Sequence, residues 1–134
     1  MKQERNEQEI FWEKEYTYDY QQKNRLEEFD INIGIEAWKI MLNKTTSVNT
    51  VLECGSNLGR NMLFLEKAYP KIKKSIIEVA KSPFDYVTSE FNISSSFNGT
   101  IIESNLDDKF DLVFTMGVLI HIHPSNLIEN TDKI

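Results

Sequence analysis

The chain has 134 residues, of which 40% are hydrophobic and 27% charged, so it has the length of one domain and is not disordered over most of its length. The formal net charge of -6 disfavours general binding to nucleic acid, which depends on clustered Lys and Arg. The single cysteine excludes an internal disulfide, and neither an apolar run of about 20 residues nor a signal peptide is present, so the sequence predicts a cytoplasmic protein that does not enter a membrane.

Two helices are expected before the first glycine-rich loop. The first begins near Ile10, where aromatic residues recur four positions apart, and the second covers residues 33–44, with Trp38 on its apolar stripe. We assign these helices to residues 1–46 and the remaining core to residues 47–134 of one domain, 1–134.

From residue 50 onward, strand and helix patterns alternate. Strands are expected at 50–53, 75–79, 100–102 and 111–115. One helix starts near Leu58 and is closed by Pro70, and another starts with Ser82 as its N-cap. A further helix or turn follows near the C-terminus. This order predicts an α/β layered domain with a mostly parallel sheet.

Polar residues follow each expected strand, at the edge of the sheet where ligands bind in open α/β folds. They are Glu53 to Asn61, Glu78, 103–105 and 115–117. Glu78 is placed to accept both hydroxyls of a ribose, although an exposed charge beside a strand is the alternative. Asn105 is placed to bond an adenine edge.

The loop "LECGSNLGRN" has the spacing acid-x-Gly-x-x-x-Gly, formed by Glu53, Gly55 and Gly59. A dinucleotide loop would need glycines at positions 57 and 60, which hold Asn57 and Arg60, and the phosphate-binding lysine pattern is also absent. Asn57 is compatible with a tight loop because asparagine adopts positive φ more readily than most residues. The spacing fits a loop for S-adenosylmethionine, and a plain strand-to-helix turn is the alternative.

The stretches "VLECGSNLGRN", "SIIEV" and "FDLVFTMGVLIHI" resemble three motifs of class I S-adenosylmethionine-dependent methyltransferases. More narrowly, "FWEKEYTYDYQQKN", the Asn57 loop and "GVLIHIHP" are similar to the methylases associated with pseudaminic acid biosynthesis. The resemblance implies a Rossmann-like three-layer sandwich and S-adenosylmethionine as the cofactor. It implies methyl transfer to a small polar metabolite or an amino sugar.

The same resemblance implies roles for individual residues. The residues implied to bind the cofactor are Glu53, Gly55, Asn57 and Gly59 along the methionine and ribose, Glu78 at the ribose, Asn105 near the adenine, Thr115 after the fourth strand, and Tyr20 and Asn24 in the N-terminal motif. Apart from the resemblance, the position of His121 after the fourth strand makes it the best candidate for a catalytic base, and a packed or capping histidine is its alternative. No metal site is expected, because "HIH" lacks a third ligand, and Cys54 is expected to be a small buried residue.

Members of this family continue into a fifth strand and a final antiparallel pair, so strands five to seven are expected to be missing here. The edge of the fourth strand is then uncovered, which predicts a homo-oligomer through that edge. Two other functions remain open at this point: cleavage of S-adenosylmethionine by lyase or hydrolase chemistry, and a non-catalytic binding or assembly module.

Overall fold

The computed structural model describes residues 7, 28–45, 47–106 and 108–134. The helix expected from Ile10, together with Tyr20 and Asn24, lies outside the described residues. Within them, no helix is both long enough and apolar enough to cross a membrane.

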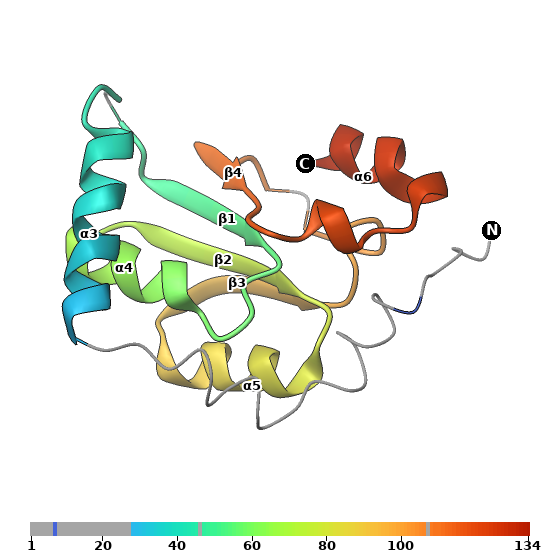
Figure 1. The fold of residues 1–134 in the computed structure, drawn as a ribbon, viewed down its shortest axis with the longest axis horizontal. Coiled ribbons are helices and arrows are strands. Elements are labelled where there is room, and N and C mark those ends of the chain that lie inside the picture. Colours follow the sequence, from blue (N-terminus) through green and yellow to red (C-terminus); the bar gives the residue numbers. More distant parts are fainter. Residues whose placement is uncertain (1–6, 8–27, 46, 107) are drawn as a thin grey trace.

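Four parallel strands form a single sheet in the order β3-β2-β1-β4 (Figure 1). The strands are β1 (Thr50–Cys54), β2 (Lys73–Glu78), β3 (Ile93–Asn98) and β4 (Leu112–Phe114). In the centre, Leu52 pairs with Ser75 on one side and with Val113 on the other. The α/β class and the parallel sheet predicted from the sequence are therefore confirmed, and the sheet is short.

Three helices cover one face of this sheet: α3 (Glu28–Leu42), α4 (Arg60–Ala68) and α5 (Lys81–Glu90) (Figure 1). Successive strand residues point to opposite faces, so Val51 of β1 and Ile76 of β2 join the helix-covered core, together with Trp38, Met62, Leu65 and Val87. Helix α4 ends two residues before Pro70, as expected. Because Glu53 and Glu78 are in phase with Val51 and Ile76, they also lie on the helix-covered face, at the carboxyl ends of their strands.

The opposite face is covered mainly by irregular chain. Leu52, Cys54 and Ile77 pack there against Ile101, Phe110 and Ile122. The short helices η1 (Leu119–His121) and η2 (Pro124–Asn126) lead into α6 (Leu127–Lys133). Lys133 ties α6 to the loop before β4 by donating hydrogen bonds to the carbonyl oxygens of Ile102 and Ser104. A cavity of about 350 Å³ remains beneath this layer, with Leu52, Cys54 and Ile134 in its lining.

The expected third strand at 100–102 is wrong. The strand is Ile93–Asn98, and residues 101–103 form a turn in which the Thr100 hydroxyl bonds the Glu103 carboxylate. This strand lies at the edge of the sheet and its residues are partly buried or exposed, so it contains serines where a central strand has apolar residues. Ile101 is buried, but it belongs to the apolar cluster on the face of the sheet opposite the three helices and is not part of a strand.

The expected N-cap of the helix between β2 and β3 is also wrong. Helix α5 begins at Lys81 with Ala80 as its N-cap, and Ser82 lies inside the first turn. The Ala80 N–H group donates to the Glu78 carboxylate instead of to a capping hydroxyl. The Glu78 side chain at the end of β2 thus satisfies one backbone N–H group at the start of α5.

Candidate functional site

The loop between β1 and α4 has a backbone that few residues adopt. Gly55, Asn57 and Gly59 have φ values of 87°, 49° and 78°. A Cβ atom on Gly55 would collide with the side chain of Val118, so glycine is required there for packing as well as for φ. The expectation that Asn57 fits the loop by adopting positive φ is confirmed.

Glu78 joins this loop to the start of α5. One carboxylate oxygen accepts a hydrogen bond from the Asn57 N–H group at 2.6 Å, and the other accepts from the Ala80 N–H group at 2.7 Å. The residue is 6% exposed, so the alternative of an exposed charge is wrong. Burial raises the pKa of the carboxyl group, and the backbone hydrogen bonds oppose that rise. The backbone N–H group of Val79 also contributes, so three of the roughly four lone pairs of the carboxylate face backbone donors and one is left for a further donor.

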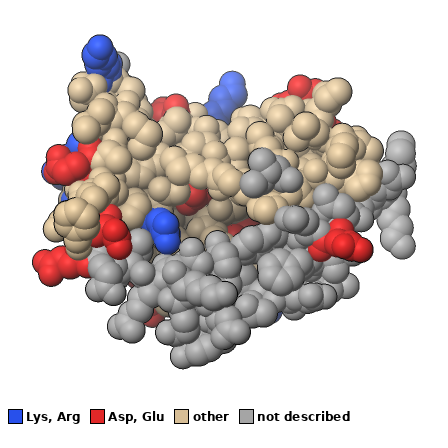
Figure 2. Space-filling view, in the orientation of Figure 1, with Lys and Arg blue, Asp and Glu red and all other residues tan. Residues whose placement is uncertain are grey.

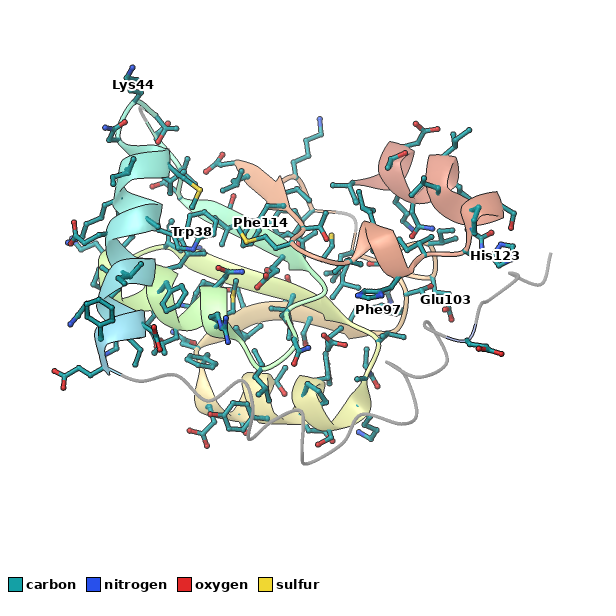
Figure 3. The ribbon with its side chains drawn as sticks, in the orientation of Figure 1. Trp38, Lys44, Phe97, Glu103, Phe114 and His123 are labelled. Carbon is teal, nitrogen blue, oxygen red and sulfur yellow. The ribbon has the colours of Figure 1, made fainter. Side chains whose placement is uncertain are left out.

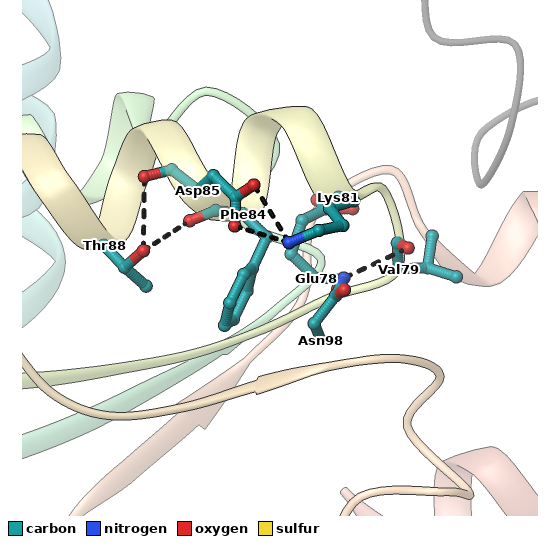
Figure 4. A network of polar contacts seen from close by, with 7 residues as sticks. All are labelled: Glu78, Val79, Lys81, Phe84, Asp85, Thr88 and Asn98. Carbon is teal, nitrogen blue, oxygen red and sulfur yellow. Dashed lines mark hydrogen bonds and ion pairs between the residues drawn. The ribbon is translucent and has the colours of Figure 1, made fainter.

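Asn98 is a site residue that the sequence does not reveal, because the strand it ends lies earlier than the expected 100–102. The Asn98 amide donates to the carbonyl oxygens of Glu78, at 2.8 Å, and Val79, at 3.3 Å (Figure 4). Gly99 donates its N–H group to the same Glu78 carbonyl. The ends of β2 and β3 are thereby fixed around the Glu78 backbone while its side chain holds the loop.

Glu53 is the second buried acid, only 2% exposed. Its Oε2 atom accepts a hydrogen bond from Asn61 Nδ2 at 2.8 Å, and Asn61 Oδ1 accepts one from the Trp38 indole at 3.1 Å. Its Oε1 atom is buried and has no hydrogen-bond partner among the described residues. Burial raises the pKa of Glu53 to about 8, the Asn61 hydrogen bond opposes this, and the nearby Glu78 adds to it.

Asn61 and Trp38 were not identified as site residues from the sequence. Asn61 stands at the second position of α4, and Trp38 was read only as part of an apolar stripe. Ser56 also lies in the polar stretch Glu53 to Asn61 but was given no role, and its hydroxyl is buried without a hydrogen-bond partner in the described part of the chain. A polar residue in the first turn after a glycine loop was the one available signal.

The remaining predicted residues divide into two groups. Thr115 is brought to the loop, since its hydroxyl donates to the Cys54 carbonyl at 2.9 Å. Asn105 is exposed in the segment after the turn at 101–103. Among the described residues it makes no hydrogen bond to Glu53 or Glu78. His121 is half-buried in η1, three residues after the Val118 side chain that faces Gly55.

Cys54 is a buried free thiol. Burial raises its pKa to about 11, with a smaller contribution from the charge of Glu53. The thiol is therefore protonated at neutral pH and is not a nucleophile there. The expectation of a small buried residue is confirmed.

Comparison with known proteins gives a match in structure only. No family model and no curated protein sequence matches the chain. A Leishmania major S-adenosylmethionine-dependent methyltransferase has a TM-score of 0.71 at 12% identity, over 94% of this chain and 53% of its own. The plantazolicin methyltransferase BamL, solved with S-adenosylhomocysteine, has a TM-score of 0.68 at 15% identity, over 93% and 49%. The sugar N-methyltransferase KedS8 from Streptoalloteichus sp ATCC 53650 has a TM-score of 0.59 at 14% identity, over 75% and 40%.

The chain thus spans about half the length, or less, of these structures. At 12 to 15% identity, what these structures share with the chain is the fold. The chain has the fold of class I S-adenosylmethionine-dependent methyltransferases.

Proposed function

We propose that the chain binds S-adenosylmethionine at the carboxyl ends of β1 and β2. The observation that carries this proposal is the pair of buried acids, Glu53 and Glu78, beside a loop with three residues at positive φ. The cofactor has two positive charges, on its sulfonium and ammonium groups, and a ribose diol. Carboxylates suit all three groups, and the unpartnered Oε1 of Glu53 leaves an acceptor for one of them.

Each predicted residue keeps its proposed role in this site. Glu78 binds the ribose hydroxyls, and Asn105 contacts the adenine. The residues proposed along the methionine and ribose are Glu53, Gly55, Asn57 and Gly59, and Thr115 is proposed to bind the cofactor after the fourth strand. Tyr20 and Asn24 remain predictions because they lie outside the described residues. The proposal takes 1–134 as one domain.

The proposed activity is methyl transfer to a small polar metabolite or an amino sugar, as in the methylases associated with pseudaminic acid biosynthesis. The fold shared with a sugar N-methyltransferase supports this acceptor class. The cofactor supplies a methyl group on a sulfonium, and His121 is proposed to take the acceptor's proton. Lys and Arg are scattered singly over the described part of the face in Figure 2, which supports a small acceptor rather than nucleic acid. A cytoplasmic location completes the proposal.

We also propose that a second copy of the chain covers the outer edge of β4. This strand pairs with β1 on one side and is the last strand of the described sheet on the other. Its three residues are only half-buried, and Met116 just beyond them is 48% exposed. An apolar strand edge of this kind pairs readily with another strand.

Calorimetric titration with S-adenosylhomocysteine tests the binding site. We expect wild type to bind, and Glu78→Ala to weaken binding by about 10- to 100-fold, the usual effect of losing hydrogen bonds to a charged group. Glu78→Gln keeps the side-chain volume and replaces the alanine variant in this measurement if that variant does not fold. Glu90→Ala is the control, since Glu90 is an exposed acid on α5.

The outcomes separate the rival functions. Absence of binding by a folded wild-type protein would refute both enzyme activities and leave a binding or assembly module. Breakdown of S-adenosylmethionine without an added acceptor would favour the lyase or hydrolase activity. Unchanged binding by both Glu78 variants would show that the ribose assignment is wrong.

A further inference from the structure

The orientation of the Asn61 amide is determined by its neighbours. The Trp38 indole nitrogen is a hydrogen-bond donor only, so it must face the Asn61 oxygen at 3.1 Å. The amide nitrogen then necessarily points to Glu53, at 2.8 Å. Asn61 therefore offers Glu53 a donor and cannot offer it an acceptor.

Trp38 is itself held by two elements. It projects from α3, and its ring packs edge-on against Phe114 of β4, with ring centroids 4.9 Å apart (Figure 3). Trp38 is buried, so its indole N–H group needs the partner that Asn61 supplies. Three elements, α3, α4 and β4, thus converge to fix one side chain beside the end of β1.

One carboxylate oxygen of Glu53 accepts a hydrogen bond, and the other accepts none from the described residues. Its Oε2 receives the Asn61 N–H group, whereas Oε1 is buried without a partner among the described residues. The Met116 sulfur lies 3.5 Å from the same Asn61 nitrogen, and this flexible side chain is about half exposed. The Met116 side chain thus reaches from the surface to the Asn61 amide that bonds Glu53.

The surroundings of Glu53 balance its two protonation states. Burial and the charge of Glu78 on β2 favour the neutral acid, and the Asn61 N–H group favours the carboxylate. Its neighbours from α3, α4 and the segment after β4 are Trp38, Asn61 and Met116, and none of them carries a charge. A positive charge arriving at Oε1 would tip this balance toward the carboxylate.

We propose that Asn61, clamped by Trp38, is a positioning residue that presents the bare Glu53 oxygen to a positively charged group of the ligand, whose arrival releases the Glu53 proton to solvent. The step balances, because a neutral acid and a ligand cation become a carboxylate, the bound cation and one free proton. The inference rests on the proposed function for the identity of the ligand, a compound with an ammonium or sulfonium group.

The first experiment counts protons during binding. S-adenosylhomocysteine, which keeps the ammonium group, is titrated into the protein at pH 7 in two buffers of different ionisation enthalpy. We expect wild type to release close to one proton per ligand and Glu53→Gln to release none. Affinity should rise between pH 6 and 8 in wild type and be flat in Glu53→Gln.

Asn61→Asp is the matched change at the positioning residue. It keeps the size of the side chain and an acceptor for Trp38, but it turns an oxygen toward Glu53. We expect binding at pH 7 to weaken about tenfold or more, and the rise in affinity to move to higher pH. Asn32→Asp on α3 adds the same charge at an exposed position and should behave as wild type.

A second measurement needs no ligand. In a Trp12→Phe background, Trp38 fluorescence should change with pH, with a midpoint near 8, and Glu53→Gln should abolish the change.

If wild type binds no S-adenosylhomocysteine, the proposed function fails, while this fluorescence titration still tests the network of Trp38, Asn61 and Glu53. The positioning role is overturned if Asn61→Asp keeps wild-type affinity and pH dependence, or if Glu53→Gln leaves the fluorescence titration unchanged. Trp38→Phe, which removes the clamp, should weaken binding and serves if Asn61→Asp does not fold.

Discussion

Glu53 makes the stability of the fold depend on pH. Its pKa rises from an ordinary 4.5 to about 8 in the folded state, chiefly because it is buried. Between these pH values the unfolded chain has lost a proton that the folded protein keeps, so stability falls as the pH rises. The raised pKa of Glu78 acts in the same direction.

We therefore expect Glu53→Gln, which resembles the neutral acid, to change the free energy of unfolding little at pH 4.5. At pH 8 it should raise that free energy by about 1 to 3 kcal/mol. Urea unfolding at both pH values measures the difference, with Glu90→Gln as the exposed control. Equal effects at the two pH values would contradict a raised pKa.

Gly55 and Gly117 show two different reasons for a glycine: a positive φ, and lack of space for a side chain. Both have positive φ, at 87° and 70°, but a Cβ on Gly55 meets Val118, whereas a Cβ on Gly117 has no heavy atom within 4 Å among its described surroundings. Gly117→Ala should therefore lower the free energy of unfolding by about 1 kcal/mol, from backbone strain alone. Gly55→Ala should lower it by at least about 2 kcal/mol, because overpacking adds to the strain. Thermal unfolding of both variants tests the pair, and equal losses would contradict the packing argument.

At the scale of the elements, the sequence predicts those whose pattern reflects burial. Strands β1 and β2 are central, so burial on both faces leaves apolar runs, and Pro70 marks the end of α4. Strand β3 has no apolar run and no proline to mark it, since an edge strand tolerates serine. The apolar pair at 101–102 belongs to a turn. The start of α5 differs from the prediction because its N-cap is Ala80, whose N–H group bonds Glu78, a side chain from another element.

Strand β4 is joined to β1 at its start by Asp111. Its carboxylate accepts hydrogen bonds from the N–H groups of Asn49, at 2.7 Å, and Thr50, at 3.1 Å, and its own N–H group donates to the Thr50 hydroxyl. These backbone bonds hold the pKa of Asp111 below its usual value of 3.8. Their stabilising effect is therefore full above pH 3.8 and is lost as the pH falls through the lowered pKa.

Asp111→Ala should consequently loosen β4 while leaving the rest of the sheet in place. The expected result is faster amide hydrogen exchange in β4 and unchanged exchange in β2 at neutral pH. Asp108→Ala, an exposed acid in the preceding loop, is the control. Uniformly faster exchange across the sheet, or no change in β4, would contradict the role given to Asp111.

At the scale of the whole molecule, the site could be predicted where it depends on chain order alone. The acids and glycines follow their strands in sequence, so a parallel sheet brings Glu53, Glu78 and Thr115 to one edge. Asn61 and Trp38 could not be found in this way, because their role depends on how α3 packs against α4 and β4. Residues 23 positions apart meet there only through tertiary packing.

The open edge of β4 gives the last prediction, which concerns assembly. If a second copy pairs with this edge, a charge placed beside it should oppose association, because strand edges carrying Lys resist pairing. We expect wild type to sediment as a dimer or larger species and Met116→Lys to move it toward monomer. Tyr86→Lys is the matched control, since Tyr86 on α5 is 46% exposed and Met116 is 48% exposed. A wild-type protein that sediments as a folded monomer, or a Tyr86→Lys variant that dissociates as readily as Met116→Lys, would show that β4 is not the interface.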